Sequence, residues 1–273
     1  MKAMKERSVL ITGASSGIGE AAAARLADRD WRVFGTSRRP PAAAHPSVEW
    51  TEMDVCDETS VKHAVARILE KTERIDALVC NAGFGIYGSV EEVDLEAARR
   101  QLDTNFFGIL RVLRATLGPM REAAAAGADE RVVLVGSLAG RAPIPFQAHY
   151  SASKAAVDAL ALALRNELRT FGVKVSLVEP GDIDTPFNDA MAWQHVADSP
   201  YRESLERCER VIRESLPLAP GPETVARVIE RALSARRPRV RYTAGASSRL
   251  VPIARRLLPD WLSLAFIRSH FDL

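Results

Sequence analysis

The chain has 273 residues, of which 47% are hydrophobic and 26% are charged, a composition typical of a soluble globular protein. The 37 Lys and Arg residues nearly balance the 35 Asp and Glu residues, which leaves a net charge of +2. Because no block of like charge stands out, the composition gives no case for nucleic acid as a partner. The length suffices for a sizeable buried core, in one large α/β domain or in two small ones.

Cysteine usage and the start of the chain bear on the cellular compartment. Cys56, Cys80 and Cys208 are isolated and have no spacing typical of a metal site. A sparse, odd set of this kind favours a reducing compartment over a disulfide framework, and we expect no metal. The apolar run at residues 9–11 is too short for a signal peptide or a membrane span. We therefore expect a cytoplasmic protein without a transmembrane segment.

Short β-branched runs alternate with helical patterns up to about residue 180. Runs typical of strands cover residues 8–12, 31–36, 48–54, 76–81, 131–137 and 173–180. Apolar residues recur at helical spacing over residues 18–29, 59–72, 95–120 and about 150–171. Strands this apolar are typical of a parallel sheet that is covered on both faces. The unbroken alternation predicts a single doubly wound α/β domain over residues 1–273, with helices on both faces of its sheet.

The pattern loosens after residue 180. Residues 181–222 form a variable segment that is long for a plain connection, and such segments are typical of substrate lids. A helix over residues 222–236 and a last strand over 239–243 follow. The C-terminal extension, about residues 245–273, alternates Arg with Leu, Ile, Trp and Phe. Contact with a membrane surface is one interpretation, but Pro252 and Pro259 interrupt any long amphipathic helix. A dimer contact or a substrate lid is therefore favoured.

A glycine-rich loop, TGASSGIG at residues 12–19, lies directly between the first strand and the first helix. Glycines permit a tight turn and let the backbone approach a pyrophosphate, whose charge is met by the helix N-terminus. An ordinary Gly-rich turn is the alternative, but the flanking strand and helix are the context that dinucleotide binding requires. The residues expected to bind the cofactor here are Gly13, Ser15, Ser16, Gly17, Ile18 and Gly19.

Two more features stand where strands of such a sheet deliver their carboxyl ends. The third strand closes on Asp54 and Val55, and Asp54 is suited to hydrogen-bond an adenine amino group. The fourth strand closes on Asn81, Ala82 and Gly83, which would let a cofactor pass close to the backbone. Each feature alone is more typical of a plain turn. Together, on one edge of one sheet, they favour a cofactor site.

Tyr150 and Lys154 open a helix that is otherwise rich in Ala and Leu. Side chains four residues apart share a helix face, about 6 Å apart along the axis. They are either an aromatic and a charge on the surface, which is the usual position of both residue types, or a pair that acts on one ligand.

These motifs together resemble the short-chain dehydrogenase/reductase family. The resemblance rests on TGASSGIG, on NAG (81–83), on Asn105 within LDTNFFG, on Ser137 ahead of YSASK (150–154) and on EPGDIDT (179–185). They stand in the family's order and approximate spacing over residues 8–186. The implied fold is a Rossmann-type domain. YSASKAAV and VEPGDIDTPF are similar to the branch that holds hydroxysteroid and retinol dehydrogenases.

The resemblance implies a role for each polar residue. Tyr150 is the acid in carbonyl reduction and the base in alcohol oxidation, while Ser137 hydrogen-bonds the substrate oxygen. Lys154 binds the nicotinamide ribose, and we expect its ammonium to lower the pKa of Tyr150. Asn105 holds a water that links Lys154 to solvent. The cofactor contacts in this part of the chain are Tyr150, Lys154, Pro180, Gly181, Ile183 and Thr185.

The end of the second strand bears on the choice of cofactor. Ser37 stands where relatives that prefer NAD carry Asp, and Arg38 supplies a donor fork suited to a 2′-phosphate. The other basic position of NADP-binding relatives, just before Gly17, is Ser16 here. We therefore expect NADP(H) to be preferred and NAD(H) to remain possible.

The resulting hypothesis is an NADP(H)-dependent oxidoreductase acting on a secondary alcohol or ketone of a fairly apolar molecule. Phe187, Met191 and Trp193 either line its apolar substrate pocket, which we favour, or pack a lid onto the core. The alternative is a catalytically weak, nucleotide-bound regulatory or scaffold protein of the same fold. The helix over 150–171 is apolar nearly all round, which predicts a homodimer or homotetramer.

Overall fold

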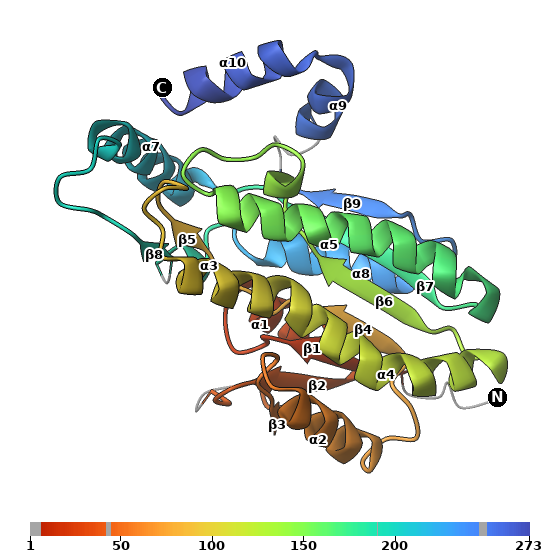
Figure 1. Ribbon diagram of the computed structural model, residues 1–273. Helices are drawn as coiled ribbons and strands as arrows, with labels where there is room; N and C mark the ends of the chain where they lie inside the picture. Colours follow the sequence, from red (N-terminus) through yellow and green to blue (C-terminus); the bar gives the residue numbers. More distant parts are fainter. Residues whose placement is uncertain (1–6, 42–44, 190, 246–249) are drawn as a thin grey trace.

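The computed structural model describes residues 7–41, 45–189, 191–245 and 250–273. Its centre is a seven-stranded sheet of parallel strands in the order β3-β2-β1-β4-β6-β7-β9 (Figure 1). The strands are β1 (Arg7–Thr12), β2 (Trp31–Ser37), β3 (Val48–Glu52), β4 (Ala77–Cys80), β6 (Arg131–Val135), β7 (Lys174–Pro180) and β9 (Arg241–Ala244). The strand order reverses between β1 and β4. In parallel sheets, ligands bind beyond the carboxyl ends of the strands at such a reversal.

Helices cover both faces of the sheet, so the doubly wound α/β fold is confirmed (Figure 1). One apolar cluster joins the sheet to α1 (Gly17–Ala27) and α8 (Glu223–Ser234). The other joins it to α2 (Glu58–Leu69), α4 (Gly108–Ala125) and α5 (Ala148–Glu167). Within β1, Val9 and Ile11 belong to the first cluster and Leu10 to the second. This alternation follows from the two-residue period of a strand.

The helix expected over residues 95–120 is interrupted, which corrects the prediction. It consists of α3 (Leu95–Leu102), a π-helical turn over Asp103–Phe107, and α4. A π turn inserts a residue into the helical ladder, and such turns are frequent at functional sites. The spacing of apolar residues does not reveal one extra residue in a helix, so the sequence pattern predicted a single continuous helix.

The variable segment also contains structure that its sequence did not indicate. It forms α6 (Pro186–Asp189), β8 (Ala192–Trp193) and α7 (Arg202–Ser215). β8 pairs in parallel with β5 (Ile86–Tyr87), far away in the chain. Strands of two residues are too short to show a period. In the C-terminal extension, α9 (Leu250–Leu257) ends before Pro259, and α10 (Asp260–His270) begins just after it.

A group of buried charges lies at the end of the sheet where its strands begin. Asp76 accepts hydrogen bonds from the Ser8 backbone at 2.8 Å and from Arg74 Nε at 2.5 Å. Glu130 is fully buried, has no hydrogen-bond partner for its carboxyl oxygens among the described residues, and lies 4.0 Å from Arg74 Nε. Burial, together with the nearby Asp76 charge, raises the pKa of Glu130 to about 8.

We predict that Glu130→Gln raises the melting temperature more at pH 8.5 than at pH 5. A carboxyl whose pKa is raised in the folded state keeps its proton there while the unfolded chain loses it. Its stabilising proton is therefore lost as pH rises from the ordinary value of 4.5 through about 8. The difference should be on the order of a few degrees in thermal unfolding scans. Equal shifts at both pH values, or the same difference in the exposed control Glu96→Gln, would contradict this assignment.

Candidate active site

The glycine loop lies at the reversal of strand order, between β1 and α1. Gly13 and Gly17 have positive φ of +64° and +55°, a conformation that glycine adopts without a steric penalty. A Cβ at Gly13 would lie 2.8 Å from the Ala82 Cα, and one at Gly19 would lie 2.1 Å from the Gly13 oxygen. The loop is therefore compressed against the end of β4, and its backbone is open to a ligand.

Thr12 and Asn81 join this loop to the end of β4. The Thr12 hydroxyl accepts hydrogen bonds from the backbone nitrogens of Asn81 and Ala82, at 3.0 and 3.1 Å. Asn81 Nδ2 donates in return to the Thr12 and Gly13 carbonyls, at 3.1 and 3.0 Å. The side-chain amide of Asn81 thus holds the first two residues of the glycine loop against the end of β4.

The end of β2 offers hydrogen-bonding groups that the described chain leaves unused. Ser37 is buried, and its hydroxyl has no partner among the described residues. Arg38 is exposed, and none of the ion pairs found among the described residues involves it. Ser16 is the N-cap of α1 but makes no side-chain cap hydrogen bond, and Ser15 and Ile18 flank it on a half-exposed loop. A buried unpartnered hydroxyl beside a free guanidinium fits a phosphorylated nucleotide.

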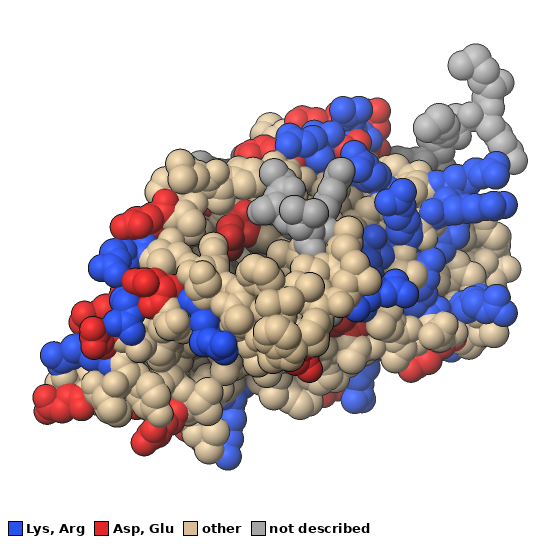
Figure 2. Space-filling view, turned by 90° about the horizontal axis from the view of Figure 1, so that it is seen from above, with Lys and Arg blue, Asp and Glu red and all other residues tan. Residues whose placement is uncertain are grey.

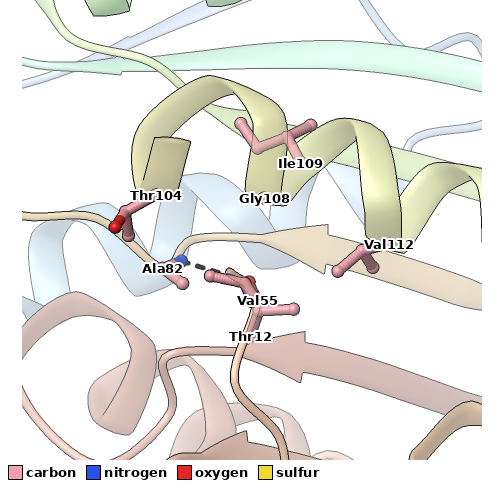
Figure 3. A pocket seen from close by; sticks show the side chains of 7 residues that line it. All are labelled: Thr12, Val55, Ala82, Thr104, Gly108, Ile109 and Val112. Atoms are coloured by element: carbon pink, nitrogen blue, oxygen red, sulfur yellow. Dashed lines mark hydrogen bonds between the residues drawn. The ribbon is translucent and has the colours of Figure 1, made fainter. Parts of the chain in front are cut away.

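A small apolar hollow lies between the ends of β1, β4 and the start of α4 (Figure 3). Val55 and Ala82 face each other across it, with Gly108 above them. The other residues that line it are Thr12, Thr104, Ile109 and Val112. Asp54 stands next to the hollow, and its Oδ1 accepts the Cys56 backbone N–H at 2.9 Å. The structure therefore brings the expected adenine contacts, Asp54 and Val55, to one place. One carboxylate oxygen of Asp54 is already engaged by the backbone of the turn that follows it.

Asn105 lies in the π-helical turn and is fully buried. Its Oδ1 accepts from the Phe84 nitrogen, and its Nδ2 donates to the Phe84 oxygen and to Ser153 Oγ, all at 3.0 Å. Ser153 donates in turn to the Tyr150 carbonyl at 2.7 Å. The side-chain amide of Asn105 is thus engaged with protein atoms. Sequence reasoning did not include Ser153, although its position three residues after Tyr150 places it within reach of that carbonyl.

Tyr150, Lys154 and Ser137 converge beside Gly83. Lys154 is 6% exposed, and its Nζ donates to the Val135 carbonyl at 3.0 Å. The same Nζ lies 5.7 Å from the centre of the Tyr150 ring, and 3.7 Å from where a Cβ at Gly83 would stand. The hydroxyl of Ser137 hydrogen-bonds the Tyr150 phenol and accepts from the Ala139 nitrogen at 3.1 Å. Lys154 is therefore not a surface charge but lies beside Tyr150 in the interior, and joint action of the two side chains on one ligand stays a prediction.

The expectation that Lys154 lowers the pKa of Tyr150 is wrong for this structure. Burial raises the pKa of Tyr150 to about 12, against the opposing effect of the Ser137 hydrogen bond. Burial also lowers the pKa of Lys154 to about 8. Desolvation disfavours the charged form of each group. The phenol therefore retains its proton at neutral pH, while the amine loses part of its charge only as the pH approaches 8.

The turn after β7 reaches the glycine loop from the other side. Pro180 is buried, and the Gly181 nitrogen donates to the Ala244 oxygen at 3.0 Å. Ile183 and Thr185 are both buried, and a Cβ at Gly17 would lie 3.3 Å from the Thr185 Cβ. The expected nicotinamide contacts therefore lie beside the expected phosphate contacts.

An ion pair that sequence reasoning missed holds this turn. Glu179 is 1% exposed, and Arg141 Nε contacts its Oε1 at 2.6 Å, with Arg241 NH1 at 3.2 Å from the same oxygen. The pair joins the end of β7 to the turn that follows Ser137. Single charges scattered along a sequence give no signal of such a contact.

A further apolar cluster, which we call the lid cluster, packs around Tyr87. Its members are Ile144, Phe146, Phe187, Met191, Trp193, Leu205, Cys208, Val211, Ile212, Ile267 and Phe271. Phe187 lies 5.8 Å from Tyr150, ring centre to ring centre, as a pocket residue would. Trp193 stacks on Tyr87 at 4.0 Å instead, and Met191 is buried in the same cluster. A place in the substrate pocket therefore stays a prediction for Phe187, whereas Met191 and Trp193 pack into the lid cluster.

The C-terminal extension takes part in this lid. Phe271 and Ile267 of α10 pack into the lid cluster, so α10 is joined to α7. The outer side of α9 and α10 stays apolar, with Leu257 and Trp261 74% and 70% exposed. Seen from that side, the middle of the molecule is mostly uncharged (Figure 2). Within the described residues, no helix is long and apolar enough to cross a membrane.

We predict that Gly19→Ala weakens dinucleotide binding more than tenfold and lowers the free energy of unfolding by about 1–3 kcal/mol. Its Cβ would meet a backbone oxygen at 2.1 Å, and backbone cannot give way cheaply. Gly118→Ala is the control, because it lies inside α4 with nothing within 4 Å of its added Cβ. That change should stabilise by up to about 1 kcal/mol. Cofactor titration and thermal unfolding measure both effects, and equal behaviour of the two variants would refute the compression of the loop.

Comparison with known proteins agrees with the geometry. Residues 7–195 match the family model described as short chain dehydrogenase. A 3-ketodihydrosphingosine reductase of Bacteroides thetaiotaomicron is 34% identical, over 89% of this chain and 89% of its own length. Human 17-beta-hydroxysteroid dehydrogenase type 1 is 35% identical, over 92% and 81%.

Solved structures show the same fold. A short-chain dehydrogenase from Streptomyces avermitilis superposes with a TM-score of 0.80 at 29% identity, covering 97% of this chain and 98% of that one. A 3-ketoacyl-(acyl-carrier-protein) reductase from Brucella melitensis, complexed with NADH, gives 0.75 at 25% identity, covering 88% and 96%. The chain therefore belongs to the short-chain dehydrogenase/reductase family of nucleotide-binding oxidoreductases that act on CH–OH groups.

Proposed function

We propose that this protein is an NADP(H)-dependent oxidoreductase that interconverts a ketone and a secondary alcohol on a fairly apolar molecule. The observation that carries the proposal is the convergence of Tyr150, Ser137 and Lys154, with the Lys154 amine beside Gly83 at the end of β4. Carbonyl reduction needs a proton donor at the oxygen and hydrogen bonds that stabilise the developing negative charge. These groups supply both.

Tyr150 is the proton donor. Because burial raises its pKa to about 12, the phenol is protonated at neutral pH and can give its proton to the carbonyl oxygen as negative charge develops there. The Ser137 hydroxyl, already hydrogen-bonded to the phenol, lies where it can also donate to that oxygen. In the oxidation direction the same phenol must first lose its proton, and Ser137 favours that step by hydrogen-bonding the phenolate.

Lys154 and Asn105 position the proton donor. Lys154 Nζ is held by the Val135 carbonyl at 3.0 Å and lies 5.7 Å from the centre of the Tyr150 ring, where it can hydrogen-bond the ribose of a bound nicotinamide nucleotide. Asn105 holds the start of α5 through Ser153, which bonds the Tyr150 carbonyl. Because the amide of Asn105 is engaged with Phe84 and Ser153, a water relay at this residue would use its main-chain carbonyl.

A nicotinamide cofactor, when bound, supplies or accepts the hydride. The residues proposed to hold its pyrophosphate and adenine sides are Gly13, Ser15, Ser16, Gly17, Ile18, Gly19, Ser37, Arg38, Asp54, Val55, Asn81, Ala82 and Gly83. Those proposed for its nicotinamide side are Tyr150, Lys154, Pro180, Gly181, Ile183 and Thr185. The crowded glycines and the unpartnered Ser37 hydroxyl support this set.

An apolar substrate is supported by the surroundings of the phenol. Phe187 faces Tyr150, and the lid cluster behind it is almost wholly hydrophobic. The reductase and the dehydrogenase found as relatives are named for a ketodihydrosphingosine and a hydroxysteroid. Both names are compatible with a fairly apolar substrate here.

The second candidate function, a catalytically weak regulatory or scaffold protein, is less well supported. It would not require Asn105, Ser137, Tyr150 and Lys154 to be present and connected as they are. We place the protein in the cytoplasm. In support, Cys56, Cys80 and Cys208 are all free thiols, as a reducing compartment keeps them.

We predict that the wild-type protein turns over at least one ketone or secondary alcohol in a panel, and that Tyr150→Phe lowers this rate by about 10²–10⁴-fold. The ring and its contact with Phe187 remain, and only the transferable proton is lost. Cofactor affinity, measured by fluorescence titration, should change little. Absorbance at the reduced-nicotinamide band reports turnover, and residual activity above a tenth of wild type would show that Tyr150 is not the donor.

We predict that Arg38→Ala weakens NADP(H) binding by about 1–3 kcal/mol, the value for a charge-assisted hydrogen bond. NAD(H) affinity should hardly change, because only the 2′-phosphate is read by the guanidinium. Arg39→Ala is the matched control, since Arg39 is equally exposed on the next residue. A similar loss for both cofactors, or a wild-type protein that favours NAD(H), would rule out the proposed phosphate contact.

We also propose that the protein is a homodimer or homotetramer. Within one chain, α5 buries one face and leaves an apolar face exposed, made of Ala152, Ala155, Ala159 and Leu162. Small residues let a second helix approach closely. Sedimentation velocity at micromolar concentration should show an oligomer, and Ala159→Arg should dissociate it while Ala66→Arg, on the exposed side of α2, should not. A monomeric wild type would contradict the proposal.

A further inference from the structure

An open groove of about 450 Å³ lies at the edge of the lid. It is lined by Ser89, Val90 and Glu91 from the segment after β5, by Phe146 from the turn before α5, and by Tyr201 from the start of α7. The volume is within the range of small-molecule sites, about 300–1,000 Å³.

Aromatic contacts link the groove to the lid cluster that lies beside Tyr150. Phe146 precedes Tyr150 by four residues and packs into the same lid cluster as Phe187, whose ring lies 5.8 Å from Tyr150. Tyr201 meets Phe146 edge-on at 6.4 Å between ring centres. An apolar wall therefore runs from the phenol to the groove.

Phe146 is held in a strained conformation. Its φ is +60°, which a bulky side chain rarely adopts, and its carbonyl accepts a hydrogen bond from the Gly88 nitrogen at 2.8 Å. Strain of this kind costs about 1–3 kcal/mol and clusters at ligand sites. Here it places the aromatic ring in the wall of the groove.

The groove has one charged group. Glu91 is exposed, its Oε2 accepts a hydrogen bond from the Tyr201 hydroxyl at 2.8 Å, and no Lys or Arg pairs with it among the described residues. A carboxylate has about four acceptor sites, so the Tyr201 contact leaves capacity for further donors. Its neighbour Glu92, bonded to Ser89 Oγ at 2.8 Å, adds a second negative charge.

We infer that this groove binds the far end of the substrate, and that Glu91 selects an apolar molecule that ends in a hydrogen-bond donor, a hydroxyl or an ammonium, against one that ends in a carboxylate. The inference rests on the proposed ketone chemistry at Tyr150. Val90, Phe146 and the Tyr201 ring contact the apolar body, while Glu91 accepts from its end group. An anionic end would be repelled by Glu91 and Glu92.

The test uses long-chain methyl ketones of equal length that end in a methyl, hydroxyl, ammonium or carboxylate group, with butanone as the short reference. For the wild type, kcat/KM should be at least tenfold higher for the hydroxyl and ammonium ends than for the carboxylate end. Glu91→Gln should bring this ratio close to one. Val90→Trp, which fills the groove, should lower the ratio of kcat/KM for the long ketones to kcat/KM for butanone at least tenfold. Glu96→Gln, an exposed carboxylate of α3 outside the groove, is the control and should retain the wild-type ratios.

The outcomes separate the two proposals. If ketones are turned over but the ratios of kcat/KM between end groups are the same in the wild type and in Glu91→Gln, the proposed role of the groove is wrong. The proposed function then still stands. If no ketone is turned over, the proposed function fails. Equilibrium binding of the matching hydroxyl-ended and carboxylate-ended chains, followed by tryptophan fluorescence, then decides on the groove by itself. Equal affinities would overturn it.

Discussion

The hydrogen bonds between Thr12 and Asn81 set the separation on which the whole site depends. They join the carboxyl ends of β1 and β4, where the order of the strands reverses. The glycine loop is thereby pressed so close to the end of β4 that a Cβ at Gly13 would meet Ala82, and one at Gly19 would meet Asn81 and the Gly13 carbonyl. Gly83, the residue after Ala82, lies against the buried Lys154 amine. The glycine loop and the surroundings of Lys154 are thus both positioned by the end of β4.

Burial determines the chemical character of that site. The phenol of Tyr150 and the amine of Lys154 are both withdrawn from water, which favours their neutral forms and raises one pKa while it lowers the other. A protonated phenol suits donation to a carbonyl oxygen, whereas alcohol oxidation needs the phenolate. The Ser137 hydrogen bond acts against burial and lowers the pKa of Tyr150.

The lid is built from parts of the chain that are distant in sequence. β5 pairs with β8, Trp193 stacks on Tyr87, and Phe271 of α10 packs into the same cluster. Each of these parts is too short or too irregular to be stable alone, so the cluster stabilises them jointly. The strained backbone at Phe146 is held by this packing, which explains how a bulky residue keeps a positive φ beside the reacting groups.

The sequence by itself determined the doubly wound fold, the strands of its sheet to within two residues at either end, and the positions of the glycine loop and of Tyr150 and Lys154. Those features are local, because they follow from apolar periods, turn residues and spacings of three or four. Tertiary structure decided the π turn at Asn105, the hydrogen bonds of Ser153 and the Arg141–Glu179 ion pair. It placed Phe187 beside Tyr150 and packed Met191 and Trp193 around Tyr87. It also decided the raised pKa of Tyr150, since desolvation depends on everything that packs around a group and not on the charge one turn away.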